Sequence, residues 1–342
     1  MSGGVDSAAA ALLLQRAGYA VTGVTLLLHA CGNGGQDARD ARAVADALGI
    51  EHLTLDLSAE FAREVMCRFV DEYRAGRTPN PCIDCNRSLK FGAMLDIALS
   101  QGFDAVATGH YARIRYNEES GRYLLYKAAD RAKDQTYFLY CLNQRQLSHA
   151  LFPLGEMTKE QVREIAQKEG LLNARKRDSQ DICFIPDGDY FTFLEQHTGK
   201  HYSQGDYLDL SGKVVGRHRG AAAYTIGQRK GLGIALGEPV YVCAKDMVRN
   251  TVTVGPNEAL FSSELTAKNL NWIPFPALTE PMSLTAKIRH SQNEQPCTVV
   301  PQGNQVRVVF TQPQRAATPG QAVVFYQDDL VVGGGTICSP AE

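Results

Sequence analysis

Long apolar runs and an excess of charge of either sign are both missing from this chain of 342 residues. No uninterrupted apolar stretch approaches the roughly 18 residues that a membrane span requires. The chain also does not open with a basic segment followed by a cleavable apolar core. We therefore expect a soluble protein that makes no membrane contact. The formal net charge of −2 predicts no general attraction to nucleic acid, so any RNA contact has to come from local basic patches.

The cysteines do not form the even, closely spaced set that is typical of a disulfide scaffold. There are nine of them, an odd number scattered along the chain, which suits a reducing compartment better than an oxidising one. The sequence therefore predicts a cytoplasmic protein. Its composition, 44% hydrophobic and 21% charged, is ordinary for a globular protein, and its length favours two or three domains.

Strand-like apolar runs alternate with amphipathic helices through the first half of the chain. Strands are predicted at 21–28, 53–57 and 104–108, and helices at 8–17, 37–48, 58–73 and from about Asn86 onward. A hairpin is expected over 112–127, and Thr158 with Gln161 forms a capping-box pattern that opens another helix. This alternation predicts an α/β fold with a doubly wound parallel sheet, which binds ligands beyond the carboxyl ends of its strands.

The pattern of apolar runs and glycines changes in the second half of the chain. After about residue 186 the runs become short and glycine-punctuated, and after about residue 265 alternating apolar and polar stretches follow at close intervals. This pattern predicts a small central domain and then a C-terminal antiparallel β-barrel. We expect three domains, at 1–185, 186–264 and 265–342.

The opening stretch, MSGGVDS, combines two glycines with three short oxygen-bearing side chains directly before an alanine- and leucine-rich helix. Glycines let backbone amides approach a phosphate, and the helix N-terminus adds a favourable dipole. No Lys-Ser or Lys-Thr pair follows the glycines, which excludes a Walker A loop. The alternative is a simple glycine-rich turn with a helix cap. The full pattern favours a nucleotide-binding loop.

A second motif, GRTPNPCIDCN, occupies residues 76–86. We expect Cys85 at the start of the following helix, with Arg77, Arg87 and Lys90 nearby in the sequence, an environment that lowers the pKa of a thiol. A structural metal half-site or an inert loop is the alternative. Zinc normally takes four ligands, and no second CxxC partners this one, so the motif favours a catalytic thiolate.

A third motif, DSQDICF at 178–184, contains Cys183. Alone, such a cysteine is usually a small core residue. Together with the second motif it resembles the tRNA-specific 2-thiouridylases, and the opening loop resembles that of the PP-loop ATP-pyrophosphatase superfamily. Supporting motifs are ATGHY at 107–111, KDQTYFL at 133–139, YTIGQRKGLG at 224–233 and TPGQ at 318–321. The resemblance covers nearly the whole chain.

The resemblance implies an enzyme that replaces the C2 oxygen of the wobble uridine of tRNA with sulfur. ATP, bound with Mg²⁺ to which Asp6 and Ser7 contribute, adenylates the oxygen and releases pyrophosphate, and AMP then departs. Cys183 carries the sulfur as a persulfide, and Cys85 is the second nucleophile that breaks the remaining S–S bond and leaves a Cys85–Cys183 disulfide. The persulfide comes from a sulfur donor such as a cysteine desulfurase or a sulfur-relay protein.

The resemblance also implies two sets of binding residues. The nucleotide-binding set is Met1, Ser2, Gly3, Gly4, Val5, Asp6, Ser7, Leu26 and Gly109. The tRNA-binding set is Asn80, Pro81 and Cys82 at the target base, His110 near the same pocket, and Lys133, Asp134, Gln135, Arg289, His290 and Gln321 toward the anticodon. The basic groups at 175–177 and 217–219 are further candidates for phosphate contacts.

One position departs from part of the family and leaves a second mechanism open. Some members have Asp where this chain has Cys82, so a general-base role does not transfer to it. Cys82, Cys85 and Cys183 could instead supply three thiolates to an iron–sulfur cluster. The chain could also be a PP-loop adenylating enzyme for a small metabolite, which would not explain the paired cysteines, or an inactive tRNA-binding protein.

Family members carry an apolar strand directly before the SGGxDS loop, in the middle of the sheet. Its loss would leave about ten backbone groups unpaired, at roughly 1–3 kcal/mol for each buried group. This penalty is comparable with the roughly 5–15 kcal/mol stability of a whole domain. The sequence therefore predicts that the natural chain begins upstream of Met1.

Overall fold

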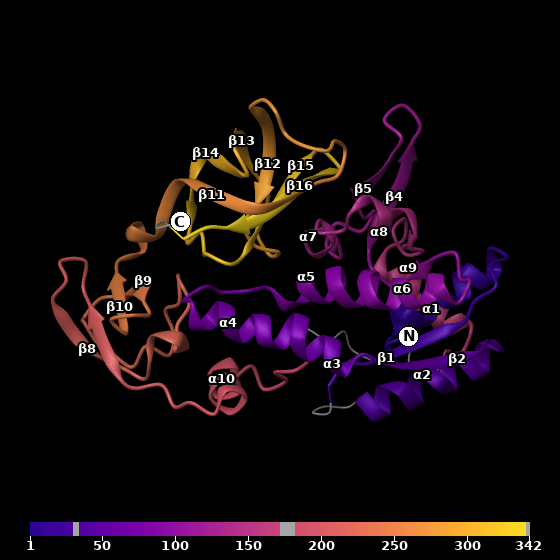
Figure 1. Cartoon of the computed structure of the whole chain (residues 1–342), viewed down its shortest axis with the longest axis horizontal. Helices are drawn as coiled ribbons and strands as arrows, with labels where there is room; N and C mark the ends of the chain where they lie inside the picture. Colours follow the sequence, from indigo (N-terminus) through magenta and orange to yellow (C-terminus); the bar gives the residue numbers. More distant parts are fainter. Residues whose placement is uncertain (30–33, 172–181, 340–342) are drawn as a thin grey trace.

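The computed structural model describes residues 1–29, 34–171 and 182–339. Its elements form an α/β region, a small central β region and a C-terminal barrel, at the right, the left and the top of Figure 1 respectively. This order confirms the fold class that the sequence pattern predicts. The domain boundaries themselves stay predictions.

The α/β region begins with alternating helices and strands. They are α1 (Val5–Arg16), β1 (Gly23–Leu27), α2 (Gly34–Leu48), β2 (His52–Asp56), α3 (Ser58–Phe61), η1 (Ala62–Cys67) and α4 (Arg68–Arg74). Strands β1 and β2 are parallel, in register from Gly23 opposite His52 to Leu27 opposite Asp56. The parallel arrangement follows from the helix that connects them, because a tight turn cannot bring the chain back in the same direction.

A second parallel pair joins β3 (Val106–Ala107) to β6 (Ala150–Leu151). Among the described residues, this pair shares no ladder with β1 and β2. The carbonyl oxygen of Met1 accepts a hydrogen bond from Thr25 Oγ1 at 2.8 Å, so the first residue lies beside β1. The opening loop is therefore positioned directly by the sheet.

A continuous helical segment carries the second motif. It consists of α5 (Pro81–Cys85), η2 (Asn86–Ala93) and α6 (Met94–Ser100). The sequence-based start near Asn86 is wrong, because Pro81 occupies the first helical position and Asn80 the N-cap. Proline suits that position, since its ring fixes φ and its missing N–H has no helical partner there. Cys85 consequently lies one turn inside the helix.

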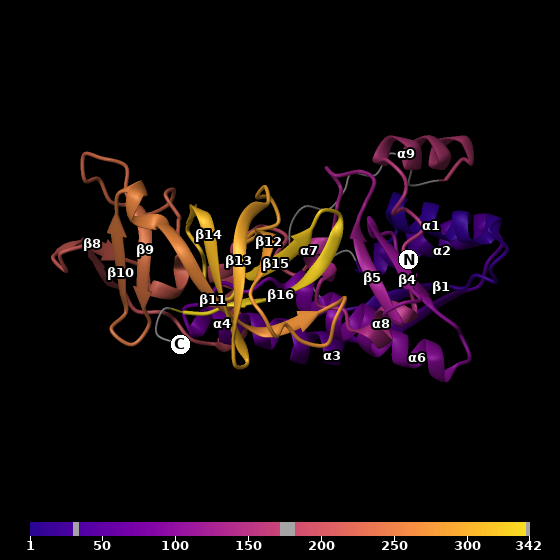
Figure 2. The ribbon, with the colours of Figure 1, turned by 90° about the horizontal axis from the view of Figure 1, so that it is seen from above.

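The remaining elements of the α/β region include the predicted hairpin, β4 (Ala112–Asn117) and β5 (Arg122–Lys127). Four helices follow: α7 (Thr136–Leu139), α8 (Gln144–Ser148), α9 (Lys159–Lys168) and α10 (Tyr190–Thr198). The capping box at the start of α9 is confirmed, since both of its reciprocal hydrogen bonds between Thr158 and Gln161 are present. Helix α9 packs beside α1 through Val5, Ala8 and Ala166 (Figure 2).

Two β structures complete the chain. The central sheet has the order β8 (Val214–His218), β7 (Gly205–Leu208), β10 (Thr251–Gly255) and β9 (Tyr241–Asp246), with short helices η3 (Ala221–Ala223) and η4 (Asn257–Leu260). The barrel comprises β11 (Phe261–Trp272), β12 (Met282–Lys287), β13 (Gln295–Gln302), β14 (Gln305–Arg315), β15 (Ala322–Gln327) and β16 (Leu330–Ile337). Pairing of β11 with both β14 and β16 closes it around a core that includes Val299, Val308 and Phe325.

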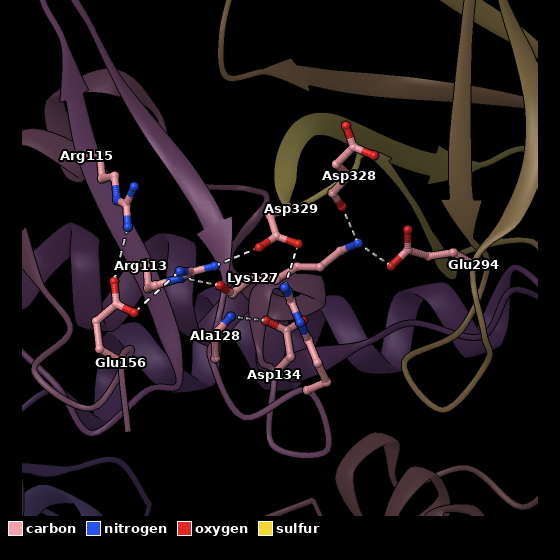
Figure 3. Close-up of polar contacts among 10 residues, drawn as sticks. Arg113, Arg115, Lys127, Ala128, Asp134, Glu156, Glu294, Asp328 and Asp329 are labelled. Atoms are coloured by element: carbon pink, nitrogen blue, oxygen red, sulfur yellow. Dashed lines mark hydrogen bonds and ion pairs between the residues drawn. The ribbon is translucent and has the colours of Figure 1, made fainter. Parts of the chain in front are cut away.

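An ion-pair network attaches the barrel to the β4–β5 hairpin (Figure 3). The Asp329 carboxylate, in the turn between β15 and β16, accepts from Arg113 at 2.9 Å and from Arg131 at 2.5 Å. Lys127 donates to the Asp328 carbonyl and pairs with Glu294 at 2.6 Å. These contacts fix the orientation of the barrel against the α/β region. Within the described ranges, no helix combines the length and the apolar character that crossing a bilayer requires.

Candidate active site

The opening loop folds closely around the start of α1. Gly4 is the N-cap in an extended conformation, and no side chain caps the helix. Ser7 Oγ accepts from the Ser2 amide at 3.2 Å and donates to the Gly4 carbonyl at 3.1 Å. Gly3 has a φ of +64°, and a Cβ there would lie 3.0 Å from the Asp37 carbonyl oxygen. An uncapped helix N-terminus behind a glycine loop suits an anion such as a phosphate.

Asp6, in the first turn of α1, is the acidic side chain of this loop. Lys159 Nζ donates to both of its carboxylate oxygens at 2.8 Å, and the Tyr111 hydroxyl donates to Oδ1 at 3.0 Å. Gly109 packs against the same residue, because a Cβ at this position would lie 2.7 Å from the Asp6 carbonyl carbon. Leu26 lies near the carboxyl end of β1, where a parallel sheet presents ligand sites. These positions form the candidate nucleotide site.

Three cysteines from two distant segments act on one another electrostatically. Cys85 is 8% exposed, whereas the side chains of Cys82 and Cys183 reach solvent. Desolvation by the surrounding protein and then the neighbouring Cys85 and Cys82 raise the pKa of Cys183, which Lys90 opposes, to a net value of about 11. The two segments that carry the predicted catalytic thiols therefore meet in the folded chain.

The expected lowering of the Cys85 pKa is wrong. Burial raises this pKa first, and among its charged neighbours Lys90 lowers it while Asp84 raises it. Because the helix begins at Pro81, Cys85 does not face the open amides of a helix N-terminus. The two arginines are also engaged elsewhere, since Arg77 Nε lies 2.6 Å from Glu72 Oε2 and Arg87 Nη1 lies 3.6 Å from Asp84 Oδ1.

Lys90 is a cation whose charge acts on all three cysteines. The sequence indicates it only as a neighbour of Cys85. Its charge lowers the pKa of Cys82, Cys85 and Cys183. It also adds to burial in lowering the pKa of the Met1 amino group, to about 5, and of His110. His110 Nδ1 lies 2.7 Å from Thr108 Oγ1. The charge of Lys90 therefore acts on all three thiols and on His110.

The loop before α5 is held by the barrel. The Thr78 amide donates to the Pro319 carbonyl at 2.8 Å, and Gln321 Nε2 donates to the Thr78 carbonyl at 2.9 Å. Gly320 fits tightly there, because a Cβ would lie 2.9 Å from the Thr78 amide nitrogen. Gln321, predicted as a tRNA contact, thus positions the segment that leads to Asn80.

The other predicted tRNA contacts come together from two regions. His290 Nε2 lies 3.3 Å from the Asp134 carbonyl oxygen, and its ring centroid lies 4.5 Å from that of Phe138. The Asp134 carboxylate is buried and accepts from the Ala128 amide at 2.9 Å. Neighbouring side chains are also engaged, since Gln135 Oε1 accepts from the Tyr111 amide at 2.9 Å and Arg289 Nη2 donates to the Ala316 carbonyl at 2.6 Å. Lys133 is partly exposed beside them.

Two basic groups, at 217–219 and 175–177, remain from the predicted phosphate contacts. The basic group at 217–219 belongs to the central sheet, at the opposite end of the molecule from α1 in Figures 1 and 2. There Arg217 pairs with Asp206 at 3.2 Å and Arg219 stacks over Phe191 at 4.6 Å. The basic group at 175–177, like Asp178 to Asp181 of the third motif, lies outside the described residues.

In the described part of the chain, no group of three or more His, Cys, Asp or Glu side chains is arranged to hold a metal ion. Cys82, Cys85 and Cys183 all belong to that part. Their arrangement therefore lends no geometric support to the iron–sulfur alternative.

The raised thiol pKa makes a testable prediction for Cys183. Since only the thiolate reacts with iodoacetamide, a pKa of about 11 predicts that its alkylation rate in the nucleotide-free protein rises about tenfold per pH unit between pH 7 and 9. Lys90→Met should slow the reaction further. Peptide mass spectrometry measures the rate. The urea-unfolded protein is the control and should level off above roughly pH 8.5. A plateau below pH 8 in the folded protein would contradict the assignment.

Comparison with known proteins places these features in a family. The chain matches models described as the tRNA methyl transferase HUP domain over residues 1–187, the tRNA methyl transferase PRC-barrel domain over 191–256 and the aminomethyltransferase beta-barrel domain over 262–337. Among solved structures, NMN synthetase from Francisella tularensis is similar at 20% identity and a TM-score of 0.34, covering 59% of this chain and 76% of that one. That likeness is too weak to bear on function.

Curated relatives have a much higher sequence identity to this chain. The tRNA-specific 2-thiouridylase MnmA of Acetivibrio thermocellus is 50% identical, with 98% of this chain and 97% of the relative covered. The protein of the same name from Moorella thermoacetica is 49% identical, with 100% and 99% covered. Half of the residues are thus shared over almost the full length of both chains, and this protein belongs to the tRNA-specific 2-thiouridylase MnmA family.

Proposed function

We propose that this protein catalyses ATP-dependent 2-thiolation of the wobble uridine of tRNA. The observation that carries the proposal is a packing contact between the opening loop and the helical segment of Cys85. Gly109 lies against Asp6 of the loop, and the ring of the next residue, His110, lies 6.1 Å from that of Phe91 in the same helical segment as Cys85. A nucleotide held by the loop and the two thiols thereby share one reaction region. A small-metabolite adenylating enzyme would have no use for a second thiol at this place.

The first step activates a poor leaving group. The C2 oxygen of uridine attacks the α-phosphorus of ATP, and the bond to the departing pyrophosphate breaks. The loop amides of Ser2–Ser7 and the α1 N-terminus would bind the phosphates. The Asp6 carboxylate faces Lys159, so we assign the Mg²⁺ of the nucleotide to the phosphates themselves.

The next two steps transfer sulfur. The terminal sulfur of a Cys183 persulfide adds to C2, and AMP leaves with the former uridine oxygen. Cys85 then attacks the Cys183 sulfur, and the electron pair of the broken S–S bond stays on the transferred sulfur as the thiocarbonyl. This leaves a Cys85–Cys183 disulfide, which a cellular thiol must reduce before the next turnover. The persulfide is supplied by a sulfur donor such as a cysteine desulfurase or a relay protein.

Both thiols have raised pKa values in the nucleotide-free chain. A resting enzyme with protonated thiols is protected from premature disulfide formation, because the thiolate is the attacking species. Lys90 is a neighbouring cation that favours the thiolate form of each. The cytoplasm, whose thiols keep such cysteines reduced, is the compartment that suits this cycle.

The function is tested by incubating the purified protein with a tRNA transcript, ATP, Mg²⁺ and a cysteine desulfurase with cysteine. We expect 2-thiouridine at the wobble position, detected by nucleoside mass spectrometry, and pyrophosphate release that depends on tRNA. Pyrophosphate release without tRNA would identify a metabolite-adenylating enzyme, and tRNA binding without any release would identify an inactive binding protein. Stoichiometric iron and acid-labile sulfide in anaerobically purified protein would favour the cluster mechanism instead.

A further inference from the structure

The opening loop lacks a feature that many phosphate-binding loops provide for themselves. A Walker A loop carries its own lysine, which reaches the β- and γ-phosphates. The sequence Ser2–Ser7 contains no basic residue. The folded chain brings a lysine to this loop from far along the sequence, since Lys159 Nζ lies 2.8 Å from both oxygens of Asp6.

Rigid elements hold Lys159 in this place. It is the first residue of α9, and its backbone amide donates to Asp130 Oδ2 at 3.0 Å. Helix α9 packs directly on α1, so both ends of the ion pair are anchored to the same core. The Lys159 side chain is only 5% exposed, and the Tyr111 hydroxyl supports the pair through Asp6 Oδ1 at 3.0 Å. The ammonium is therefore preorganised beside the loop.

The ion pair of Lys159 and Asp6 lies at the N-terminus of α1. The N-terminus of a helix carries a partial positive charge and favours negative groups. Lys159 starts α9 and its ammonium reaches the first turn of α1, where Asp6 balances its charge and no side chain caps the helix, so this N-terminus still favours an anion. A buried ion pair alone is also a poor source of stability, because desolvation of both charges offsets their attraction. A phosphate bound at the uncapped N-terminus of α1 would lie beside the Lys159 ammonium.

We propose that Lys159 is a nucleotide-binding residue that contacts the β- and γ-phosphates of ATP, and that Asp6 and Tyr111 hold its ammonium ready. Lys159 takes the role that the lysine of a Walker A loop plays, although it comes from a separate helix. The inference rests on the proposed function only for the identity of the nucleotide. It assigns the pyrophosphate half of ATP, rather than the adenosine half, to the surface beside Asp6.

Nucleotide binding to the purified protein tests this without tRNA or sulfur donor. Isothermal titration calorimetry with ATP, inorganic pyrophosphate and AMP, each with excess Mg²⁺, gives the three dissociation constants. We expect Lys159→Met to weaken ATP and pyrophosphate binding by about ten- to hundredfold, the range of a hydrogen bond to a charged group. AMP binding should change by less than about threefold. Lys159→Arg should recover part of the loss, and Lys168→Met, an exposed lysine on the same helix, is the matched control.

If Lys159→Met alone fails to fold, the double variant Asp6→Asn with Lys159→Met takes its place. The double variant removes both charges of the ion pair, so no Asp6 carboxylate is left without its ammonium partner. The proposal expects its pyrophosphate binding to stay weak. Recovery of wild-type binding in the double variant, equal losses for ATP and AMP, or unchanged pyrophosphate binding in Lys159→Met would each overturn the proposal. A wild-type protein that binds pyrophosphate through Lys159 yet makes no 2-thiouridine would refute the proposed function and leave this inference intact.

Discussion

A Cys183→Ser variant is expected to form no detectable 2-thiouridine while it still releases pyrophosphate from ATP in the presence of tRNA. Serine cannot carry a persulfide, so sulfur transfer stops completely. Adenylation requires no thiol and should continue, because the opening loop and Gly109 are untouched by the change. Nucleoside mass spectrometry and a coupled pyrophosphate assay measure the two steps separately.

In a Cys85→Ser variant the reaction should stop one step later than in Cys183→Ser. The sulfur can reach C2, but nothing then cleaves the S–S bond, so tRNA accumulates as a disulfide-linked adduct of Cys183. A non-reducing gel would show the adduct, and dithiothreitol would release it. Cys67→Ser, which changes an exposed cysteine outside the thiol pair, is the control and should thiolate normally. If either variant of the pair retains more than about a tenth of wild-type thiolation, the two-thiol mechanism is wrong.

Gly109→Ala is the second change for which a large effect is expected. The added methyl group would lie 2.7 to 2.9 Å from the backbone and Cβ of Asp6. Neither partner is the flexible end of a side chain, so the start of α1 has to shift. Overpacking of a closely fitted site costs roughly 1–3 kcal/mol, and we expect ATP affinity to fall about ten- to hundredfold. Calorimetric titration with ATP provides the measurement.

The control for this substitution is Gly35→Ala. Gly35 is exposed in α2, and the nearest atom to a Cβ there is the end of the Arg39 side chain at 3.7 Å. That variant should bind ATP like the wild type. Normal ATP affinity in Gly109→Ala, with an unchanged melting temperature, would show that the loop tolerates displacement and that its close packing has no role in binding.

Sequence reasoning succeeds where a long periodic pattern or a local capping signal determines the structure. The helix over 37–48, the hairpin over 112–127 and the capping box at Thr158 depend on neighbours within a few residues, and the structure confirms them. The start of the helix that carries Cys85 is predicted five residues late. The prolines in TPNPC suggest a stiffened loop, whereas Pro81 begins the helix.

The parts of the site that sequence reasoning misses depend on contacts between distant segments. The capping box identifies the start of α9, but nothing local indicates that Lys159 reaches Asp6 across the packed helices. Lys90 stands out in the sequence only as a neighbour of Cys85, because its effect on Cys183 and His110 requires the fold. The sequence predicts the thiol pKa in the wrong direction since burial, which outweighs the nearby charge, has no signature in the sequence.

The contacts of Pro319 and Gln321 with Thr78 have a practical consequence for protein engineering. The barrel supplies part of the framework that holds the loop before Asn80, so we expect the N-terminal region alone to lose the geometry of this loop. Truncating the chain before β11, or grafting on a foreign C-terminal module, would remove that support even where the catalytic cysteines and the glycine loop were left intact. Chimeras within this family should therefore exchange the TPGQ segment and its facing loop together.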